Sequence, residues 1–208
     1  MSTSASAAFA DLLRTRLHGI AELGDPEVSA MREHYELLVR WNKVINLTSV
    51  KGLAEIVERH YCESVFLAVH IPDGAVSAAD IGSGAGFPGI PLAIMRPKTA
   101  VSLIEAHQRK AVFLREASRA LPNVRVVASR ANDVNASFEW VISRAVRAQD
   151  IARDLARLGS KVALLTTGED TGELPGFQSH TRIRVPWGDN RFLWIGQVPL
   201  SVDRASFT

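Results

Sequence analysis

The feature that most constrains the fold of this chain is a regular alternation of short apolar runs and helical segments over residues 76–166. The apolar runs have the length and residue types of β-strands, and they span 76–81, 101–106, 124–129, 140–145 and 161–166. The segments between them have helical character, at 88–96, 107–120 and 148–158. Strands that alternate with helices are typical of a mostly parallel sheet that is covered by helices on both faces.

The two ends of the chain follow other patterns. Residues 8–70 carry apolar side chains at helical spacing, and one helix is predicted over 53–69. Toward the other end, 181–187 and 191–198 are strand-like and are joined by Gly-Asp-Asn at 188–190, a hairpin signal. These ends therefore predict helices before the sheet and an antiparallel pair of strands at its far side.

Together the patterns predict an α/β protein of Rossmann-like architecture. We expect a doubly wound, mostly parallel seven-stranded sheet domain at 73–208, preceded by an N-terminal helical extension at 1–72. The chain has 208 residues, of which 47% are hydrophobic and 22% charged. Such a composition is typical of a globular protein with a sizeable core.

Cysteine usage and hydropathy exclude several classes of protein. Cys62 is the single cysteine, so neither an intramolecular disulfide nor a cysteine-based zinc site can form. The first residues lack the pattern of a secretory signal, and no apolar run reaches the roughly 18 residues that span a bilayer. We therefore expect a cytoplasmic monomer that binds neither a membrane nor a metal.

A glycine-rich turn, DIGSGAGFPGI at residues 80–90, follows the first predicted strand. Gly84, Gly86 and Gly89 match the G-x-G-x-x-G fingerprint of dinucleotide-binding proteins, and Glu105 ends the next predicted strand. A carboxylate there can accept hydrogen bonds from ribose hydroxyls. This pattern alone indicates an NAD(P)-dependent oxidoreductase.

Two residues argue against a dinucleotide. Asp80 ends the first strand directly before the turn, and its negative charge would face a pyrophosphate. Gly82 already supplies the tight turn, so the fingerprint would begin two residues late. A ligand with a ribose, an adenine and a positive charge fits this turn better. S-adenosylmethionine is such a ligand, and its charges would favour Asp80 while its ribose would bind Glu105.

Five stretches of this sequence resemble one family. They are RWNKVINLTSV (40–50), RHYCES (59–64), DIGSGAGFPGIPLAI (80–94), EAHQRKAVFLREA (105–117) and VISRAV (141–146). In this order and spacing they resemble the bacterial small-subunit ribosomal RNA guanine-N7 methyltransferases, also called the glucose-inhibited division protein B family, over about residues 30–165. The resemblance implies methyl transfer from S-adenosylmethionine to N7 of a guanine in the 530 loop of 16S rRNA.

The resemblance also implies roles for single residues. It places the cofactor beside these residues: Gly82, Phe87, Ala131, Asn132 and Arg144. With Asp80, Gly84 and Glu105, which the glycine-rich turn and the next strand already indicated, they are the predicted cofactor-binding residues. Three positions depart from the family pattern: Thr167 stands where a lysine is common, Asn132 where an acid is usual, and Glu63 where aspartate is frequent. The change at Thr167 removes a positive charge that would face RNA.

The predicted chemistry needs few catalytic groups. Guanine N7 has a lone pair and no proton, so alignment of the base with the methyl donor is the main requirement. We expect no general base, and Arg144 is the candidate for a direct catalytic role, on guanine O6, a phosphate or the cofactor carboxylate.

The predicted substrate is 16S rRNA or the small ribosomal subunit. Arginine and lysine are concentrated in 109–130 and 144–161, although the formal net charge of the chain is only +2. We assign these residues to substrate binding: Asn46, His60, Arg109, Lys110 and Arg147. Phe87 and Trp41 are candidate platforms for a splayed base.

Three other readings stay open. An NAD(P)-dependent oxidoreductase is one, and a non-catalytic RNA-binding protein on a methyltransferase fold is another. A methyltransferase for small molecules is the third, although it would leave the basic stretches without a role. Nucleotide titration and methyl transfer to RNA distinguish these readings.

Overall fold

A computed structural model describes residues 3–144, 148–168 and 178–197 of the chain. The helices are α1 (Thr3–Leu17), α2 (Asp25–Trp41), α3 (Leu53–Ile56), α4 (Glu63–Val69), α5 (Gly89–Met95), α6 (Gln108–Ala117) and α7 (Ala148–Leu158). A π-helical turn, η1 (Val57–Cys62), joins α3 to α4, and a 3-10 turn, η2 (Ala131–Asp133), follows β3. The strands are β1 (Ser77–Ile81), β2 (Ala100–Ile104), β3 (Val124–Val127), β4 (Phe138–Arg144), β5 (Gly159–Thr167), β6 (Gln178–Arg184) and β7 (Arg191–Gln197).

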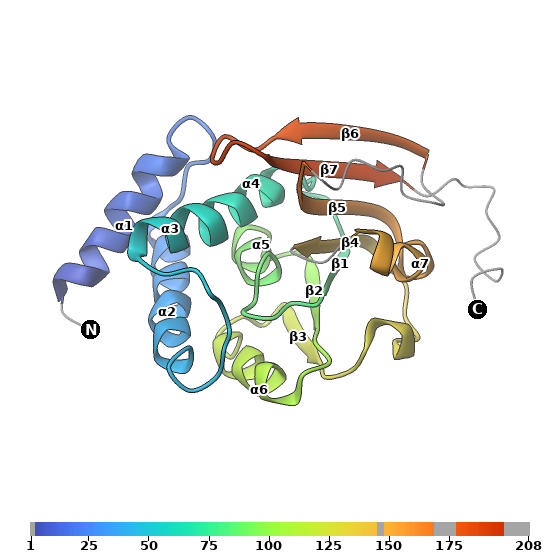
Figure 1. The fold of residues 1–208 in the computed structure, drawn as a ribbon, viewed down its shortest axis with the longest axis horizontal. Helices are drawn as coiled ribbons and strands as arrows, with labels where there is room; N and C mark the ends of the chain where they lie inside the picture. Colours follow the sequence, from blue (N-terminus) through green and yellow to red (C-terminus); the bar gives the residue numbers. More distant parts are fainter. Residues whose placement is uncertain (1–2, 145–147, 169–177, 198–208) are drawn as a thin grey trace.

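The strands form one seven-stranded sheet in the order β3-β2-β1-β4-β5-β7-β6. The first five are parallel, while β7 runs antiparallel to both β5 and β6. The predicted architecture is confirmed, including the hairpin that lies at one edge of the sheet (Figure 1). Strand order reverses between β1 and β4, and ligands of such sheets bind at the carboxyl ends of the strands beside that point.

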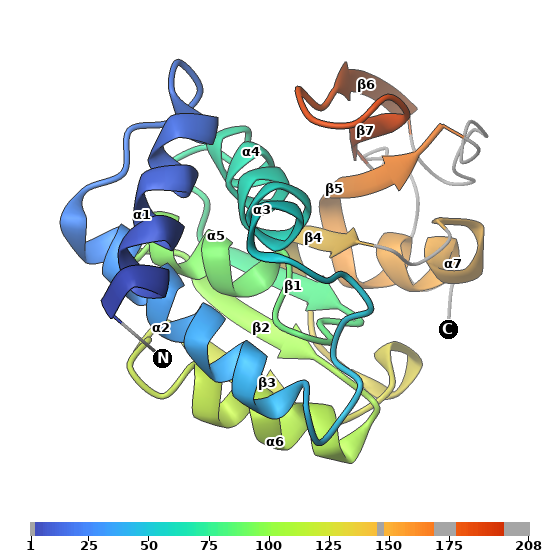
Figure 2. The ribbon, with the colours of Figure 1, turned by 60° about the vertical axis from the view of Figure 1, so that its left-hand side comes forward.

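Helices cover both faces of the sheet. On one face, α4, α5 and α6 pack against the strands, and α1 and α2 pack outside them. Helix α7 covers the other face, where Leu155 and Leu158 contact β4 and β5 in a second core cluster. Figure 2 shows α4 and α5 side by side in front of the strands and α7 away from them.

The described residues before and after position 72 share one hydrophobic core. Phe9 of α1 stacks on Tyr35 of α2, with ring centroids 4.9 Å apart, and meets the edge of Tyr61 at 5.0 Å. The same cluster continues into Ile90 of α5 and Leu103 of β2. A division of the chain at residue 72 therefore remains a prediction, because the helices before it pack directly on the sheet domain.

The predicted helix at 53–69 is confirmed in extent but not in regularity. Within it, the amide of Glu63 donates to the carbonyl of Glu58, five residues earlier, instead of four as in an α-helix. The π-turn that results contains His60, Tyr61 and Cys62, all of which are buried. Such turns occur frequently at functional sites.

Strand periodicity selects the side chains that face the helices. Ala78 of β1, Ile142 of β4 and Leu193 of β7 belong to the core cluster beneath α4 and α5. Alternate residues of a strand point to the same face, so Asp80, Arg144 and Arg191 point the same way. Among the residues described, no helix is both long and apolar enough to cross a membrane.

Candidate functional site

The glycine-rich turn lies at the carboxyl end of β1, where strand order reverses. Gly82, Gly84 and Gly86 have positive φ angles of 71°, 54° and 89°. Residues with a side chain rarely adopt such angles, because the Cβ clashes with the backbone. A Cβ at Gly86 would also lie 2.5 Å from Ile90 Cδ1, so a side chain there would force the buried Ile90 to move. Gly82 N donates to the carbonyl of Ile104 at 2.9 Å, which fixes the turn to β2.

Glu105 anchors the turn from the neighbouring strand. Its Oε2 accepts a hydrogen bond from Gly84 N at 2.9 Å, and its Oε1 accepts one from His107 N at 2.7 Å. The side chain is 8% exposed. Each carboxylate oxygen has further acceptor capacity, so Glu105 can support the turn and still accept hydroxyl donors.

Asp80 lies beneath the turn. It is fully buried, and its Oδ2 accepts a hydrogen bond from Gly89 N, at the start of α5, at 3.0 Å. With no exposed surface, Asp80 is not placed to touch a ligand directly, in contrast to the expectation from the sequence. The structure places its carboxylate as a support that joins β1 to the first turn of α5.

Burial also gives Asp80 an unusual titration. It raises the pKa of Asp80 from 3.8 to about 7, against the opposing effect of the hydrogen bond from Gly89. Because the folded state holds this proton more tightly than the unfolded chain, its stabilising contribution is complete below about pH 4. That contribution is lost as the pH rises through about 7.

We therefore expect Asp80→Asn to flatten the pH profile of stability. Denaturant unfolding of the wild type should give a free energy that declines between pH 4 and pH 7 by a few kcal/mol, whereas the variant should decline less. Asp11→Asn, on the exposed side of α1, is the matched control and should follow the wild type. Parallel profiles for the wild type and Asp80→Asn would contradict this assignment.

Phe87 is enclosed by three rings. His60 stacks on it with centroids 4.8 Å apart, and His34 and Tyr61 meet it edge-on at 5.1 and 5.0 Å. Phe87 is 6% exposed, so it supports the wall of the site and is not an open stacking platform. Trp41 packs edge-on against Phe113 between α2 and α6, at 5.8 Å, which fits a packing role.

Arg144, at the end of β4, meets the π-turn. Its Nη1 donates to His60 Nδ1 at 2.6 Å, and its Nε lies 3.8 Å from Oε2 of the buried Glu63. Arg191 of β7 forms the closer pair with Glu63, at 2.9 Å to Oε1 and 3.1 Å to Oε2. Burial lowers the pKa of Arg144 to about 10, so its guanidinium is still charged at neutral pH.

The loop between α2 and α3 closes the other side of the site. Asn42 organises it, because its Oδ1 accepts from Leu47 N at 2.8 Å and from Thr48 N at 3.0 Å. Thr48 Oγ1 lies 2.7 Å from His60 Nε2. Figure 2 shows this loop passing beside the carboxyl ends of the strands.

Several of these residues line one pocket of about 300 Å³. Its wall is formed by the loop at 47–50, by Arg59 and His60 of η1, by the glycine-rich turn at 82–87 and by Arg144. The structure thus brings together five residues predicted for the site: Gly82, Gly84, Phe87, His60 and Arg144. Glu105 joins them through its hydrogen bond to Gly84.

Other predicted site residues lie elsewhere. Ala131 and Asn132 form η2, where Arg157 donates to the carbonyl of Ala131 at 2.6 Å, and Asn132 lines a separate pocket of about 350 Å³. Asn46 is exposed on the loop that follows α2. Arg109 and Lys110 lie in the first turn of α6, and Arg147 falls outside the described residues.

Four residues that contribute to the site were not predicted from the sequence: His34, Asn42, Thr48 and Arg191. Asn42 and Thr48 lie within the RWNKVINLTSV stretch, which was a usable signal. No sequence pattern indicated His34. Its Nε2 donates to the Ala85 carbonyl at 3.0 Å, and its Nδ1 accepts from the Tyr61 hydroxyl at 2.9 Å. Burial lowers the pKa of His34 to about 4, so the ring is neutral.

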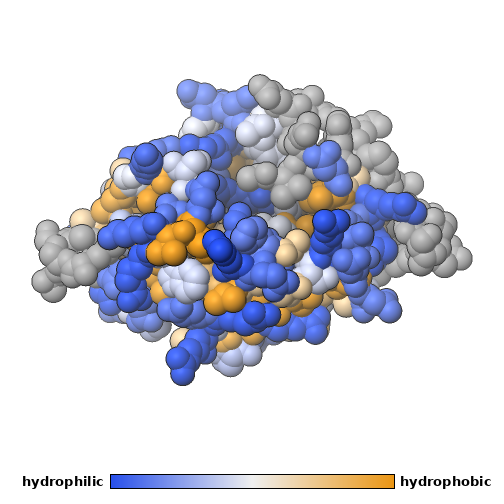
Figure 3. Space-filling model, turned by 60° about the horizontal axis from the view of Figure 1, so that its bottom comes forward, coloured by the Kyte–Doolittle hydropathy of each residue, from blue (hydrophilic) through white to orange (hydrophobic). Residues whose placement is uncertain are grey.

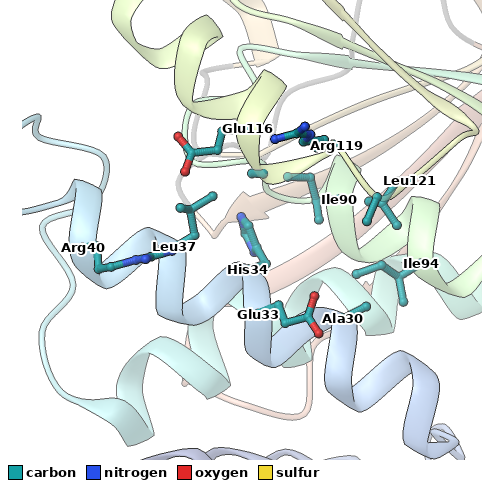
Figure 4. A pocket seen from close by; sticks show the side chains of 12 residues that line it. Ala30, Glu33, His34, Leu37, Arg40, Ile90, Ile94, Glu116, Arg119 and Leu121 are labelled. Atoms are coloured by element: carbon teal, nitrogen blue, oxygen red, sulfur yellow. The ribbon is translucent and has the colours of Figure 1, made fainter. Parts of the chain in front are cut away.

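His34 also reaches a second cavity of about 430 Å³ between α2, α5 and α6. Figure 4 shows Glu33 and Arg40 projecting from α2, Glu116 from α6 and Arg119 from the turn after α6, around an interior that includes Leu37 and Ile90. The cavity therefore lies behind the glycine-rich turn, with the His34 ring between the two.

Comparison with known proteins identifies the family. The model of the family described as rRNA small subunit methyltransferase G matches residues 27–167. The chain belongs to this family. The match runs from α2 to the end of β5, so it includes the glycine-rich turn, η1 and Arg144, while Arg191 lies beyond it.

Curated relatives in the rRNA small subunit methyltransferase G family match part of the chain. The ribosomal RNA small subunit methyltransferase G of Xanthomonas campestris pv. campestris (strain B100) is 46% identical over 114 residues, which are 53% of each chain. That of Methylobacillus flagellatus is 43% identical over 135 residues, 61% of this chain and 65% of the relative. The chain thus spans about half the length of the curated relatives that it matches.

The fold is also found among solved structures. A SAM dependent methyltransferase from Aquifex aeolicus superposes with a TM-score of 0.54 at 16% sequence identity, covering 69% of this chain and 93% of that one. At this level of identity the likeness concerns the fold alone, and it agrees with the Rossmann-like methyltransferase architecture of the sheet.

Proposed function

We propose that this chain transfers a methyl group from S-adenosylmethionine to N7 of a guanine in the 530 loop of 16S rRNA. The observation that carries the proposal is the glycine-rich turn at the point where strand order reverses, with Glu105 beside it, in a chain of the rRNA small subunit methyltransferase G family. Because the proposed substrate is ribosomal RNA, we expect the reaction to take place in the cytoplasm.

The residues of the turn fit this cofactor. Glu105 uses one acceptor position of each oxygen on backbone amides, and the remaining positions suit the two hydroxyls of a ribose. At Gly84 a Cβ would meet nothing nearer than the Gly82 carbonyl at 3.7 Å, so the space in front of this glycine is open to a ligand. When bound, S-adenosylmethionine supplies a methyl group activated by its sulfonium.

The pocket's own residues supply orientation and charge. Guanine N7 attacks without losing a proton, so the required work is to hold the base in line with the methyl group. Arg144 is the proposed contact for guanine O6 or a phosphate, which leaves N7 free. Of the titratable neighbours, Glu105 accepts a hydrogen bond from the turn and His60 accepts one from Arg144.

The RNA is expected to approach over α6 and the loop after α2. Arg109, Lys110 and Arg115 lie on α6, and Trp41 joins the two elements through its contact with Phe113. Figure 3 turns the lower side of Figure 1, where α6 lies, toward the reader and shows hydrophilic residues gathered around smaller apolar patches. Phosphate binding there should weaken steeply with salt.

Other cations of the predicted RNA surface are engaged within the protein. Arg157 donates to the Val134 carbonyl at 2.7 Å, Lys161 pairs with Glu139 at 3.0 Å, and Arg125 donates to Ser102 Oγ at 2.7 Å. The proposed RNA surface is therefore smaller than the charge distribution along the sequence indicates.

A dinucleotide fits this turn less well. In dinucleotide-binding proteins the pyrophosphate takes the amide groups at the start of the helix that follows the turn. Here the Gly89 amide at the start of α5 is taken by the Asp80 carboxylate at 3.0 Å. A pyrophosphate would have to displace this carboxylate.

Transfer of labelled methyl from S-adenosylmethionine to small ribosomal subunits that lack the 530-loop modification tests the proposal. We expect label at guanine N7, and none with Gly82→Asp, which forces a side chain into a backbone conformation with φ of 71°. Cofactor binding without transfer to RNA would favour a binding role or another acceptor. Binding of NAD in place of S-adenosylmethionine would overturn the proposal.

A further inference from the structure

The contacts of His60 define which of its ring nitrogens carries the proton. A guanidinium only donates hydrogen bonds, so His60 Nδ1, 2.6 Å from Arg144 Nη1, must be a bare acceptor. A neutral imidazole with a bare Nδ1 carries its proton on Nε2. That proton points to Thr48 Oγ1, 2.7 Å away.

The surroundings of His60 keep it uncharged. Burial lowers the pKa of His60 to about 2, and the positive charges of Arg144 and Arg59 act in the same direction. Glu63, three residues along the helix, is paired with Arg191. A protonated ring would also lose the acceptor that holds Arg144.

The ring is fixed from three sides. Phe87 stacks on its face at 4.8 Å with an interplanar angle of 22°. Thr48 Oγ1 is itself held by a hydrogen bond from Val50 N at 3.1 Å, and the Thr48 backbone is held through Asn42 Nδ2, which donates to its carbonyl at 3.0 Å. The loop after α2 therefore sets the orientation of a ring on η1.

Arg144 makes its short contact with this ring and not with its carboxylate neighbour. Its distance to Glu63 is 3.8 Å, outside normal hydrogen-bonding range, because Arg191 occupies that carboxylate at 2.9 Å. His60 Nδ1 thus supplies the short contact of the guanidinium. The N–H groups of Arg144 that do not donate to His60 belong to a side chain that lines the pocket.

We propose that His60 is a positioning residue, a neutral Nε2–H imidazole that is oriented by Thr48 and aims the Arg144 guanidinium into the pocket. The inference deepens the proposed function and rests on it, because the guanidinium so aimed is the one proposed to bind the RNA substrate. It replaces the earlier assignment of His60 as a direct contact of the substrate.

Two amide substitutions separate the nitrogens of His60. The side-chain oxygen of asparagine takes the place of Nδ1, so His60→Asn keeps an acceptor for Arg144. Glutamine reaches the place of Nε2, so His60→Gln keeps the contact with Thr48 and leaves Arg144 without its acceptor. In methyl transfer to small ribosomal subunits, we expect kcat/KM of His60→Asn within about threefold of the wild type. For His60→Gln we expect a loss of about tenfold or more, the effect of roughly one hydrogen bond to a charged group.

Calorimetry with S-adenosylmethionine serves as the control, since both variants should bind the cofactor as the wild type does. Equal activity of the two variants, or an equal loss in both, would overturn the proposal. An equal loss would indicate that the imidazole itself contacts the substrate.

Nitrogen-15 NMR of the ring gives a readout that needs no methyl transfer. We expect Nε2 protonated and Nδ1 bare in the full chain, unchanged between about pH 5 and pH 8. In Thr48→Val, which loses the acceptor of Nε2–H, the tautomer should stay the same because Arg144 sets it, while the ring should lose its fixed orientation and its signals should broaden. A wild-type ring that is protonated at Nδ1, or charged at neutral pH, would overturn the positioning role even if methyl transfer is confirmed. Absence of methyl transfer with the expected tautomer would count against the proposed function alone.

Discussion

Replacement of Glu63 with alanine should lower the free energy of unfolding by about 3–5 kcal/mol, the usual cost of breaking a buried ion pair by removing one partner. The Glu63 side chain is 1% exposed and lies between Arg191 and Arg144, whose side chains are 23% and 11% exposed. Without the carboxylate, two positive charges face each other in a site that excludes most water. Urea unfolding followed by circular dichroism measures the effect.

Glu55→Ala is the matched control for this loss. Glu55 also pairs with an arginine, Arg59, at 2.6 Å, but the two side chains are 47% and 38% exposed. Exposed pairs of this kind contribute about 1 kcal/mol or less. Equal destabilisation by the two substitutions would show that burial does not strengthen the pairing of Glu63 with Arg191 and Arg144, which would contradict this prediction.

Replacement of Glu105 with alanine should weaken binding of S-adenosylmethionine by about a hundredfold or more. Two hydrogen bonds from ribose hydroxyls to a carboxylate contribute roughly 1.5–3 kcal/mol each, and about 1.4 kcal/mol corresponds to tenfold in affinity. The turn also loses the support of Glu105 at Gly84 N and His107 N. Isothermal titration calorimetry measures the dissociation constant.

Two further variants make the role of Glu105 specific. Glu105→Gln keeps an acceptor oxygen but loses the charge, so it should fall between alanine and the wild type. Glu116→Ala removes a carboxylate from the exposed side of α6 and should bind the cofactor as the wild type does. Unchanged affinity in Glu105→Ala would mean that Glu105 supports the turn without holding a ribose.

The fold follows from local signals in the sequence to a large extent. Each predicted strand is present. Parallel strands that are buried on both faces need continuous apolar runs, and these runs are easy to recognise between turns. Bounds were less accurate: β4 begins at Phe138, two residues before the predicted start, since Phe138 pairs with Gly159 of β5. The π-turn at 57–62 has no apolar period of its own and was not predicted.

The site was less predictable because its contacts join distant residues. The glycine-rich turn and Glu105 could be predicted, since a known motif fixes the spacing between them. The pair of Glu63 and Arg191 spans 128 residues, and no local pattern indicates it. The sequence also does not indicate where a side chain points. Asp80 was therefore predicted to contact the ligand, whereas it lies beneath the turn.

The π-turn sets the rotational phase between the two halves of the helix at 53–69. The first half faces α1, whereas the second half faces α5 and β5. In a regular α-helix each residue advances by about 100°, so removal of one residue from 57–62 would rotate every later side chain by that angle relative to the earlier ones. Glu63 would turn away from Arg191 while the start of η1 kept its place beside α1. The extra residue thus lets one continuous helix satisfy two partners that demand incompatible registers.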